Sequence, residues 1–324
     1  MPVVTVLGAT GTQGGGVCQA LLSHPDWTIR GVTRNPSSEA AKALDAKGVE
    51  VVRADLDDEA SLAMAFEGAS AVFCVSNFGE LSAIKSSLEE AAAYETGQLI
   101  RAAKAAAASS TLEHFVLSAL PPVEGLSKGR FKAPHLDSKH HALEYIDQNL
   151  PELAPKTTAI WLGWYASSFL NPLFKPHFLP NIGKYLWFLP SKADALLPSA
   201  GDAGANAGTV AKAVLEHPEK TKEKIVPVVA EHIPVTIALE AWEKVTGKSA
   251  IYGEVSDAHF EKTFEPWGTE MVNQLRFSEQ FPRWDVLFPK RTVTIEQLGI
   301  QDQIVGTEGG LVFIKETAGL EQLI

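Results

Sequence analysis

The stretch MPVVTVLGATGTQGGG, from Met1 to Gly16, decides the fold that this chain is expected to adopt. Val3 to Leu7 is a run of apolar or β-branched residues, which is typical of a short strand buried on both faces. It leads directly into a glycine-rich turn, followed by a helix expected over Gly15 to Ser23. This order of strand, turn and helix predicts a dinucleotide-binding unit in a doubly wound parallel sheet, that is, a Rossmann-type α/β fold.

The glycine turn indicates how a nucleotide would be held. Its spacing is GxxGxxG, where the common fingerprint is GxGxxG. The first glycine permits the tight turn, the second lets the backbone approach a diphosphate, and the third lets the helix pack close to the strand. Amide hydrogens at the helix start point at the phosphates. The alternative is a glycine-rich turn without a ligand. The residues expected to bind the cofactor here are Gly8, Thr10, Gly11, Thr12, Gln13 and Gly14.

Composition sets the outer bounds on function. The chain has 324 residues, enough for a large core and for two domains or one domain with an appendage. A formal charge of −11 argues against broad binding to nucleic acid, because such binding needs clustered Lys and Arg. No run of about 18 apolar residues predicts a membrane span, and no secretory signal is evident, so a cytoplasmic location is expected. Cys18 and Cys74 are interpreted as buried small hydrophobes, and the scattered histidines predict no metal site.

The end of the second expected strand, Trp27 to Thr33, determines which nucleotide is favoured. An NAD site places an acid about 20 residues beyond the glycines, whereas an NADP site has a cation for the 2′-phosphate. Counting from Gly14, that position is Arg34, and no acid lies between Trp27 and Ser38. The sequence therefore predicts NADP(H), with a solvated arginine in a turn as the alternative reading.

The ends of the next strands supply further candidates. Asp55 and Leu56 follow the third strand and are expected near the adenine, while Asp57 is expected to cap the helix from Glu59 to Phe66. A fourth strand, Ala69 to Val75, is followed by polar and aromatic residues at the edge where open parallel sheets bind ligands. Those residues, expected to line the ribose or nicotinamide, are Ser76, Asn77 and Phe78.

The residues that are candidates for proton transfer lie beyond the fourth strand. An alanine-rich helix is expected from Leu81 to Ala108, with an interruption near Tyr94 to Gly97. The fifth strand ends at Ser118, whose hydroxyl is a candidate partner of a substrate carbonyl. His135 and Lys139 lie four residues apart at the start of the next helix, so both point from one face.

Four segments together resemble the NmrA-like family, an atypical branch of the short-chain dehydrogenase/reductase superfamily. They read GATGTQG, VTRNP, HFVLSAL and HLDSKHHALEYI, and the similarity is strongest over residues 1 to about 165. The resemblance implies a doubly wound parallel sheet with a smaller C-terminal α/β subdomain, and NADP(H) as cofactor. It also implies one of two functions: some members resemble reductases of quinones, ketones or benzylic ethers, and others resemble NADP-binding regulators that contact transcription factors.

The sequence departs from the superfamily's usual catalytic pair, Tyr-x-x-x-Lys. None of its five tyrosines has a lysine four residues later, and His135 stands in the tyrosine's place. A histidine suits general acid chemistry near neutral pH, and a nearby Lys139 would lower its pKa further. Alternatively Lys139 itself carries the proton chemistry after desolvation, or serves as a ribose contact. The alternative without a function is that Lys139 is a surface helix residue and His135 is a turn residue.

The C-terminal half is expected to contribute a substrate or partner subdomain over residues 163–324, after a nucleotide domain over residues 1–162. Gly163, Trp164 and Tyr165 follow the sixth strand and are expected near the nicotinamide, with Tyr165 as an alternative proton donor. The aromatic segment from Phe169 to Pro190 either walls an apolar pocket or forms the subdomain core. Residues 201–217 are expected to return to the nucleotide domain.

Two functions of different class follow from these observations. The first is an NADPH-dependent reductase of a small, largely apolar carbonyl, quinone or enone, in which Lys139 acts with His135, Ser118 or Tyr165 at the developing alkoxide. The second is a non-catalytic NADP(H)-sensing protein whose nucleotide biases a conformation read by a transcription factor or other protein partner. The sequence leaves the oligomeric state open.

Overall fold

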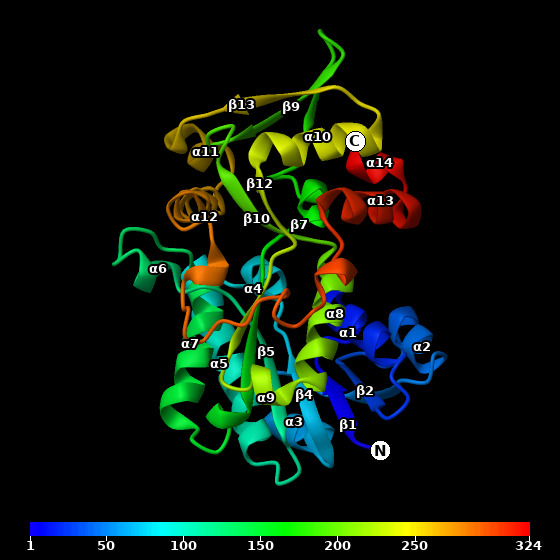
Figure 1. The fold of residues 1–324 in the computed structure, drawn as a ribbon. Helices are drawn as coiled ribbons and strands as arrows, with labels where there is room; N and C mark the ends of the chain where they lie inside the picture. The colour runs from blue at the N-terminus through cyan, green and yellow to red at the C-terminus, as the bar shows by residue number, and fades with distance from the viewer.

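A seven-stranded parallel sheet forms the centre of the computed structural model, which describes all 324 residues. The strands are ordered β11-β6-β5-β4-β1-β2-β3, so the chain builds outward from β1 in one direction and then from β4 in the other. The point where the order reverses lies between β1 and β4, and ligands of open α/β sheets bind there, outside the carboxyl ends of the strands. The predicted doubly wound fold is confirmed (Figure 1). The strand bounds are β1 Val3–Val6, β2 Thr28–Thr33, β3 Glu50–Arg53, β4 Ala69–Cys74, β5 His114–Ala119, β6 Thr157–Leu162 and β11 Ile225–Val228.

Helices cover both faces of this sheet, because its strands are apolar on both sides. One core packs α3, α5 and α7 against one face, and a second packs α1 and α8 against the other. Cys18 and Cys74 lie unpaired within these two cores, and burial raises the pKa of each thiol to about 12. The helices of this part are α1 Thr12–Leu21, α2 Glu39–Asp45, α3 Glu59–Phe66, α4 Phe78–Ile84, α5 Leu88–Ala107, α6 Val123–Leu126, α7 Pro134–Asn149, α8 Ala203–Glu216 and α9 Pro218–Thr221, with a 3-10 turn at Ala154–Lys156.

Helix α8, which follows the strands of the C-terminal half, packs on α1. Glycines make this contact possible: a Cβ on Gly16 would lie 1.9 Å from the Gly204 carbonyl oxygen, and one on Gly208 would lie 2.3 Å from that of Gly16. Strand β11 then joins the large sheet beside β6. A domain boundary at residue 162 stays a prediction, since segments on both sides of it build the same layers.

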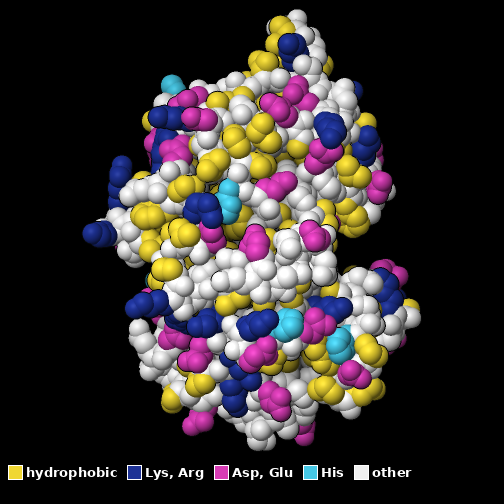
Figure 2. Space-filling model, in the orientation of Figure 1, with side chains coloured by type: hydrophobic (Ala, Val, Ile, Leu, Met, Phe, Trp, Pro, Cys, Tyr) yellow, Lys and Arg dark blue, Asp and Glu magenta, His cyan; other side chains and the backbone are white.

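The remaining elements form the second half of the molecule, in which two three-stranded sheets and a helical layer enclose an aromatic core (Figure 1). Trp187, Trp242, Phe169 and Phe260 are fully buried in that core. Lys, Arg, Asp and Glu side chains are interspersed on the face shown in Figure 2. No helix combines the length and hydropathy that crossing a bilayer requires. The elements are β7 Trp164–Tyr165, β8 His177–Leu179, β9 Lys184–Leu189, β10 Leu196–Gly201, β12 Glu231–Pro234, β13 Ala250–Glu254, α10 Val235–Thr246, α11 Asp257–Thr263, α12 Gly268–Gln280, α13 Thr307–Ala318 and α14 Leu320–Leu323, with 3-10 turns at Ala166–Leu170, Trp284–Val286 and Gln301–Gln303.

Two local expectations were wrong. The alanine-rich stretch breaks after Ile84, not near Tyr94, because the Ser87 hydroxyl accepts a hydrogen bond from the Glu90 amide and caps a new helix there. The cap of α3 is Asp58, whose carboxylate accepts bonds from the Ala60 and Ser61 amides. Its neighbour Asp57 instead pairs with Arg101 and Gln98 of α5.

Candidate functional site

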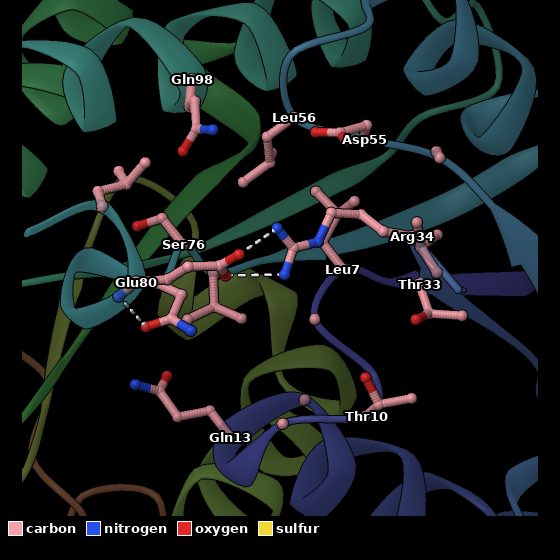
Figure 3. A pocket seen from close by; sticks show the side chains of 18 of the residues that line it. Leu7, Thr10, Gln13, Thr33, Arg34, Asp55, Leu56, Ser76, Glu80 and Gln98 are labelled. Carbon is pink, nitrogen blue, oxygen red and sulfur yellow. Dashed lines mark hydrogen bonds and ion pairs between the residues drawn. The ribbon is translucent and has the colours of Figure 1, made fainter. Parts of the chain in front are cut away.

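A cavity of about 670 Å³ lies at the carboxyl ends of β1 to β4, at the switch point of the sheet. It is lined by the glycine turn, by the residues that follow β2 and β3, and by the first residues after β4 (Figure 3). The position agrees with the general rule for ligands of open parallel sheets. The predicted cofactor-binding residues that line it are Gly8, Thr10, Gly11, Thr12, Gln13, Gly14, Arg34, Asp55, Leu56, Ser76, Asn77 and Tyr165.

The glycine turn has the geometry that its sequence predicts. Gly8 adopts a φ of +65°, in the left-handed region, and an added Cβ would lie 2.8 Å from a Val75 methyl. A Cβ on Gly14 would lie 2.3 Å from the Gly8 carbonyl oxygen, so only glycine lets α1 start this close to β1. The N-cap of α1 is Gly11, which supplies no side-chain acceptor, so the first amides of the helix are left for an anion.

These features fit a nucleotide with a diphosphate. A Cβ added at Gly11 would touch only the Gly8 carbonyl oxygen, at 3.4 Å, which leaves the cavity side of the turn clear for phosphate oxygens. Arg34 follows β2 and points across the cavity (Figure 3). The Gln13 side-chain oxygen is buried and has no hydrogen-bond partner within the protein. The cavity therefore offers backbone amides and a cation for phosphate oxygens, and the Gln13 side-chain oxygen as an acceptor for a donor group of a bound nucleotide.

A second cavity, of about 630 Å³, adjoins the first. The two share Gln13, Ser76, Asn77 and Tyr165 as lining residues, so they meet at the end of β4. Every predicted catalytic residue lines this second cavity, together with the predicted contacts that follow β4 and β6. They are Ser118, His135, Lys139, Tyr165, Phe78, Gly163 and Trp164.

Lys139 lies in the interior, within a cluster of polar side chains. Its Nζ lies 2.6 Å from Oε1 of Glu95 in α5, and the two side chains are 8% and 0% exposed. The hydroxyls of Ser76 and Ser138 donate to the same carboxylate at 2.7 and 2.5 Å. Burial opposes ionisation of Glu95, but Lys139 and the two hydroxyls hold the pKa of this carboxyl below its ordinary value. Lys139 is therefore held in the interior by a buried carboxylate, which excludes the reading of a surface helix residue.

His135 faces a different partner from the one expected. Its Nδ1 lies 3.3 Å from Oε1 of Glu270 in α12, and its backbone amide donates to the same oxygen at 2.9 Å. Lys139, expected to act on the imidazole, is instead paired with Glu95. The difference arises from tertiary packing, because α12 lies beside the start of α7 and supplies a buried carboxylate. No local sequence pattern around His135 predicts this contact.

Tyr165 stands where the two cavities meet. Its hydroxyl accepts a hydrogen bond of 2.7 Å from the Gln13 side-chain nitrogen. Burial raises the pKa of this phenol to about 12, a change that the Gln13 hydrogen bond only partly offsets. The hydroxyl is therefore protonated at neutral pH and is free to donate its proton in a hydrogen bond to a bound group.

Further aromatic residues contribute to the lining of the second cavity. Trp164, Phe174 and Trp267 line it, while Phe169 and Trp187 lie in the aromatic core of the C-terminal half. The segment from Phe169 to Pro190 thus serves both of the roles that its sequence left open, with most of its aromatics in the core.

Three acidic residues at the site were not predicted. Glu80 pairs with Arg34, Glu95 with Lys139 and Glu270 with His135. Only Glu95 carries a signal in the sequence: it shares the buried stripe of α5 with Leu88, Ala91, Leu99 and Ala102, and an acid in an apolar stripe points to a buried partner. Glu80 and Glu270 lie on helices far in sequence from their partners, so no sequence spacing predicts these two pairs.

Comparison with known proteins agrees with this fold. The family model described as the NmrA-like family matches residues 2–300. The chain belongs to the NmrA-like family. Among its relatives is the NmrA-like family domain-containing oxidoreductase hkm9 of Aspergillus hancockii, 34% identical over 54% of this chain. The chain spans 50% of the length of that relative. Another relative, the NmrA-like family domain-containing oxidoreductase cpsB of Aspergillus campestris, is 28% identical over 77% of this chain and 74% of its own length.

Solved structures share the NmrA-like fold. NmrA, described as a negative transcriptional regulator in complex with NADP, aligns with a TM-score of 0.76 at 19% identity, over 100% of this chain and 99% of its own. An NADPH-dependent quinone oxidoreductase of Escherichia coli, complexed with NADPH, aligns with a TM-score of 0.66 at 19% identity, over 91% and 94%. At these identities the likeness establishes the architecture.

Proposed function

We propose that this NmrA-like chain is an NADPH-dependent oxidoreductase that reduces a small, largely apolar carbonyl, quinone or enone. The observation that carries the proposal is the pair of adjoining cavities, which share the residues around Gln13 and Tyr165. The first has the glycine turn and the cation that a phosphorylated dinucleotide needs, and the second is open to a further molecule. The nucleotides in the NADP and NADPH complexes of the structural neighbours support the choice of cofactor.

The residues of the second cavity have complementary tasks. The reduced nicotinamide, when bound, supplies a hydride. The Lys139 ammonium, held by Glu95, stabilises negative charge at the substrate oxygen. The Tyr165 hydroxyl donates a hydrogen bond to the same oxygen, and Ser118 and His135 are further candidates for delivering the proton. The aromatic residues of the lining favour a flat, apolar substrate.

The second candidate function is a non-catalytic NADP(H)-sensing regulator that binds a transcription factor or another protein. The departure from Tyr-x-x-x-Lys favours it, and so does the phenol of Tyr165, whose pKa is raised where a proton donor would profit from a lowered one. The regulatory description of NmrA is a further point in its favour. In this role the nucleotide would shift the population of a conformation that the partner reads.

The test is consumption of NADPH in the presence of a panel of apolar quinones, enones and ketones. We expect turnover by the wild type and a loss of about 10²–10⁴-fold in kcat for Lys139→Ala, with only a modest change in affinity for NADP. The double variant Lys139→Ala with Glu95→Gln removes both buried charges, so a loss of activity there is not caused by an unpaired carboxylate. Lys132→Ala, an exposed lysine outside both cavities, is the matched control. Tight NADPH binding without turnover on any substrate would favour the regulator.

A further inference from the structure

An ion pair crosses the nucleotide cavity at the position expected for the 2′-phosphate. Arg34, which follows β2, directs both forked nitrogens at Glu80 of α4 (Figure 3). Nη1 lies 2.6 Å from Oε1 and Nη2 lies 2.7 Å from Oε2. This is the bidentate geometry with which arginine also binds a phosphate. Glu80 thus occupies the same two donors that a 2′-phosphate would use.

The competition matters because the cavity has no second cation. Of its lining residues only Arg34 is basic, whereas Asp55, Asp57 and Glu80 are acidic. The two aspartates are engaged elsewhere: Asp55 accepts a hydrogen bond from the Asp57 amide, and Asp57 pairs with Arg101. Glu80 is therefore the one carboxylate that Arg34 must leave before it can bind a phosphate.

The pair lies at an exposed position, where breaking it costs little free energy. The side chains of Arg34 and Glu80 are 61% and 40% exposed, so solvent screens their attraction. Opening the pair requires only the movement of two long side chains at the cavity mouth.

We infer that Glu80 sets the preference between NADP and NAD by competing with the 2′-phosphate for Arg34. A nucleotide without that phosphate leaves the pair closed, whereas a phosphorylated one must displace the carboxylate and then sits beside its negative charge. Glu80 thereby lowers the affinity for NADP(H) below what Arg34 alone would give. The inference rests on the proposed use of this cavity for a nucleotide and extends it to a specificity-determining residue.

The experiment measures binding of adenosine 2′,5′-bisphosphate and 5′-AMP by calorimetry, since these fragments lack a nicotinamide and report no catalysis. We expect Glu80→Gln to bind the bisphosphate about 3- to 5-fold more tightly than the wild type, because one competing charge worth up to about 1 kcal/mol is removed. The affinity of Glu80→Gln for 5′-AMP should change less than about twofold, because this fragment lacks the 2′-phosphate and solvent screens its interaction with the exposed side chain. Arg34→Ala should lose most of the preference for the bisphosphate.

Glu89→Gln is the matched control, since it removes one exposed charge from the start of α5 without touching Arg34. Equal effects of Glu80→Gln on both fragments, no effect on either, or the same effect from Glu89→Gln would each overturn the role of Glu80 while leaving the nucleotide site intact. Failure of the wild type to bind either fragment would overturn the nucleotide site itself and the inference with it. Thermal unfolding of each variant checks that the fold is retained.

Discussion

Each cavity is lined by a cation that pairs with a carboxylate, and the two pairs, Arg34–Glu80 and Lys139–Glu95, differ in how much water reaches them. Arg34 and Glu80 lie at an open mouth, while the Lys139 and Glu95 side chains are 8% and 0% exposed. A screened pair contributes little to stability and gives way easily, whereas removal of one partner of a buried pair leaves an uncompensated charge in the interior. The nucleotide cavity is therefore arranged to exchange partners, and the second cavity to fix one ammonium in place.

The strongest test of this difference is to remove the acid from the buried pair. Glu95→Ala strands the Lys139 ammonium and two hydroxyls, so we expect the free energy of unfolding to fall by about 3–5 kcal/mol in urea denaturation. The matched variant Glu80→Ala should cost less than about 1 kcal/mol. Comparable losses in the two variants would mean that water reaches both pairs alike, and the contrast between the cavities would then be lost.

A second test uses the backbone on which the nucleotide cavity alone depends. Gly14→Ala places a Cβ 2.3 Å from the Gly8 carbonyl oxygen, and the strain should lower the free energy of unfolding by about 1–3 kcal/mol. Binding of adenosine 2′,5′-bisphosphate should be lost with it, since the turn must shift. Gly97→Ala in α5 is the control: its Cβ has ordinary contacts only, at 3.6 Å, and should stabilise the helix by about 0.5–1 kcal/mol. Retained nucleotide binding by Gly14→Ala would show that the turn tolerates displacement.

The pH dependence of stability extends the comparison to buried histidines. Burial lowers the pKa of His114 to about 3 and that of His140 to about 4, against 6.5 for the unfolded chain. Between about pH 4 and 6.5 the unfolded state therefore binds more protons, so stability rises with pH and is complete above 6.5. Each group should contribute a slope of about 1.4 kcal/mol per pH unit in this window.

Denaturation midpoints measured across this pH range check the prediction. His140→Asn should remove one of the two contributions. An unchanged slope in His140→Asn would show that this imidazole takes up a proton in the folded state as readily as in the unfolded one.

The smallest expected effect is on the stability of the exposed pair itself. Glu80→Gln should change the free energy of unfolding by about 0–1 kcal/mol, a change that falls further at high salt. A loss of several kcal/mol would show that the pair holds α4 in place, and displacement of Glu80 by a ligand would then be costly.

Much of the nucleotide cavity is predictable from the sequence because its determinants are local. The glycines of the first turn, Arg34 and the residues after β3 and β4 lie at strand ends, and parallel strands bring their carboxyl ends to one edge. The second cavity is predictable in part: Ser118, His135, Lys139 and Tyr165 all line it. Their roles in binding or catalysis stay predictions.

What the sequence alone determined was the order of the first six strands, the glycine turn and the family, since these depend on short-range periodicity and on residue types at fixed spacing. Only the tertiary structure decided which acid faces which base. Glu80, Glu95 and Glu270 reach their partners from 46, 44 and 135 residues away. The physical reason is that an ion pair depends on the distance between side chains in space, and helix packing fixes that distance without leaving a pattern along the chain.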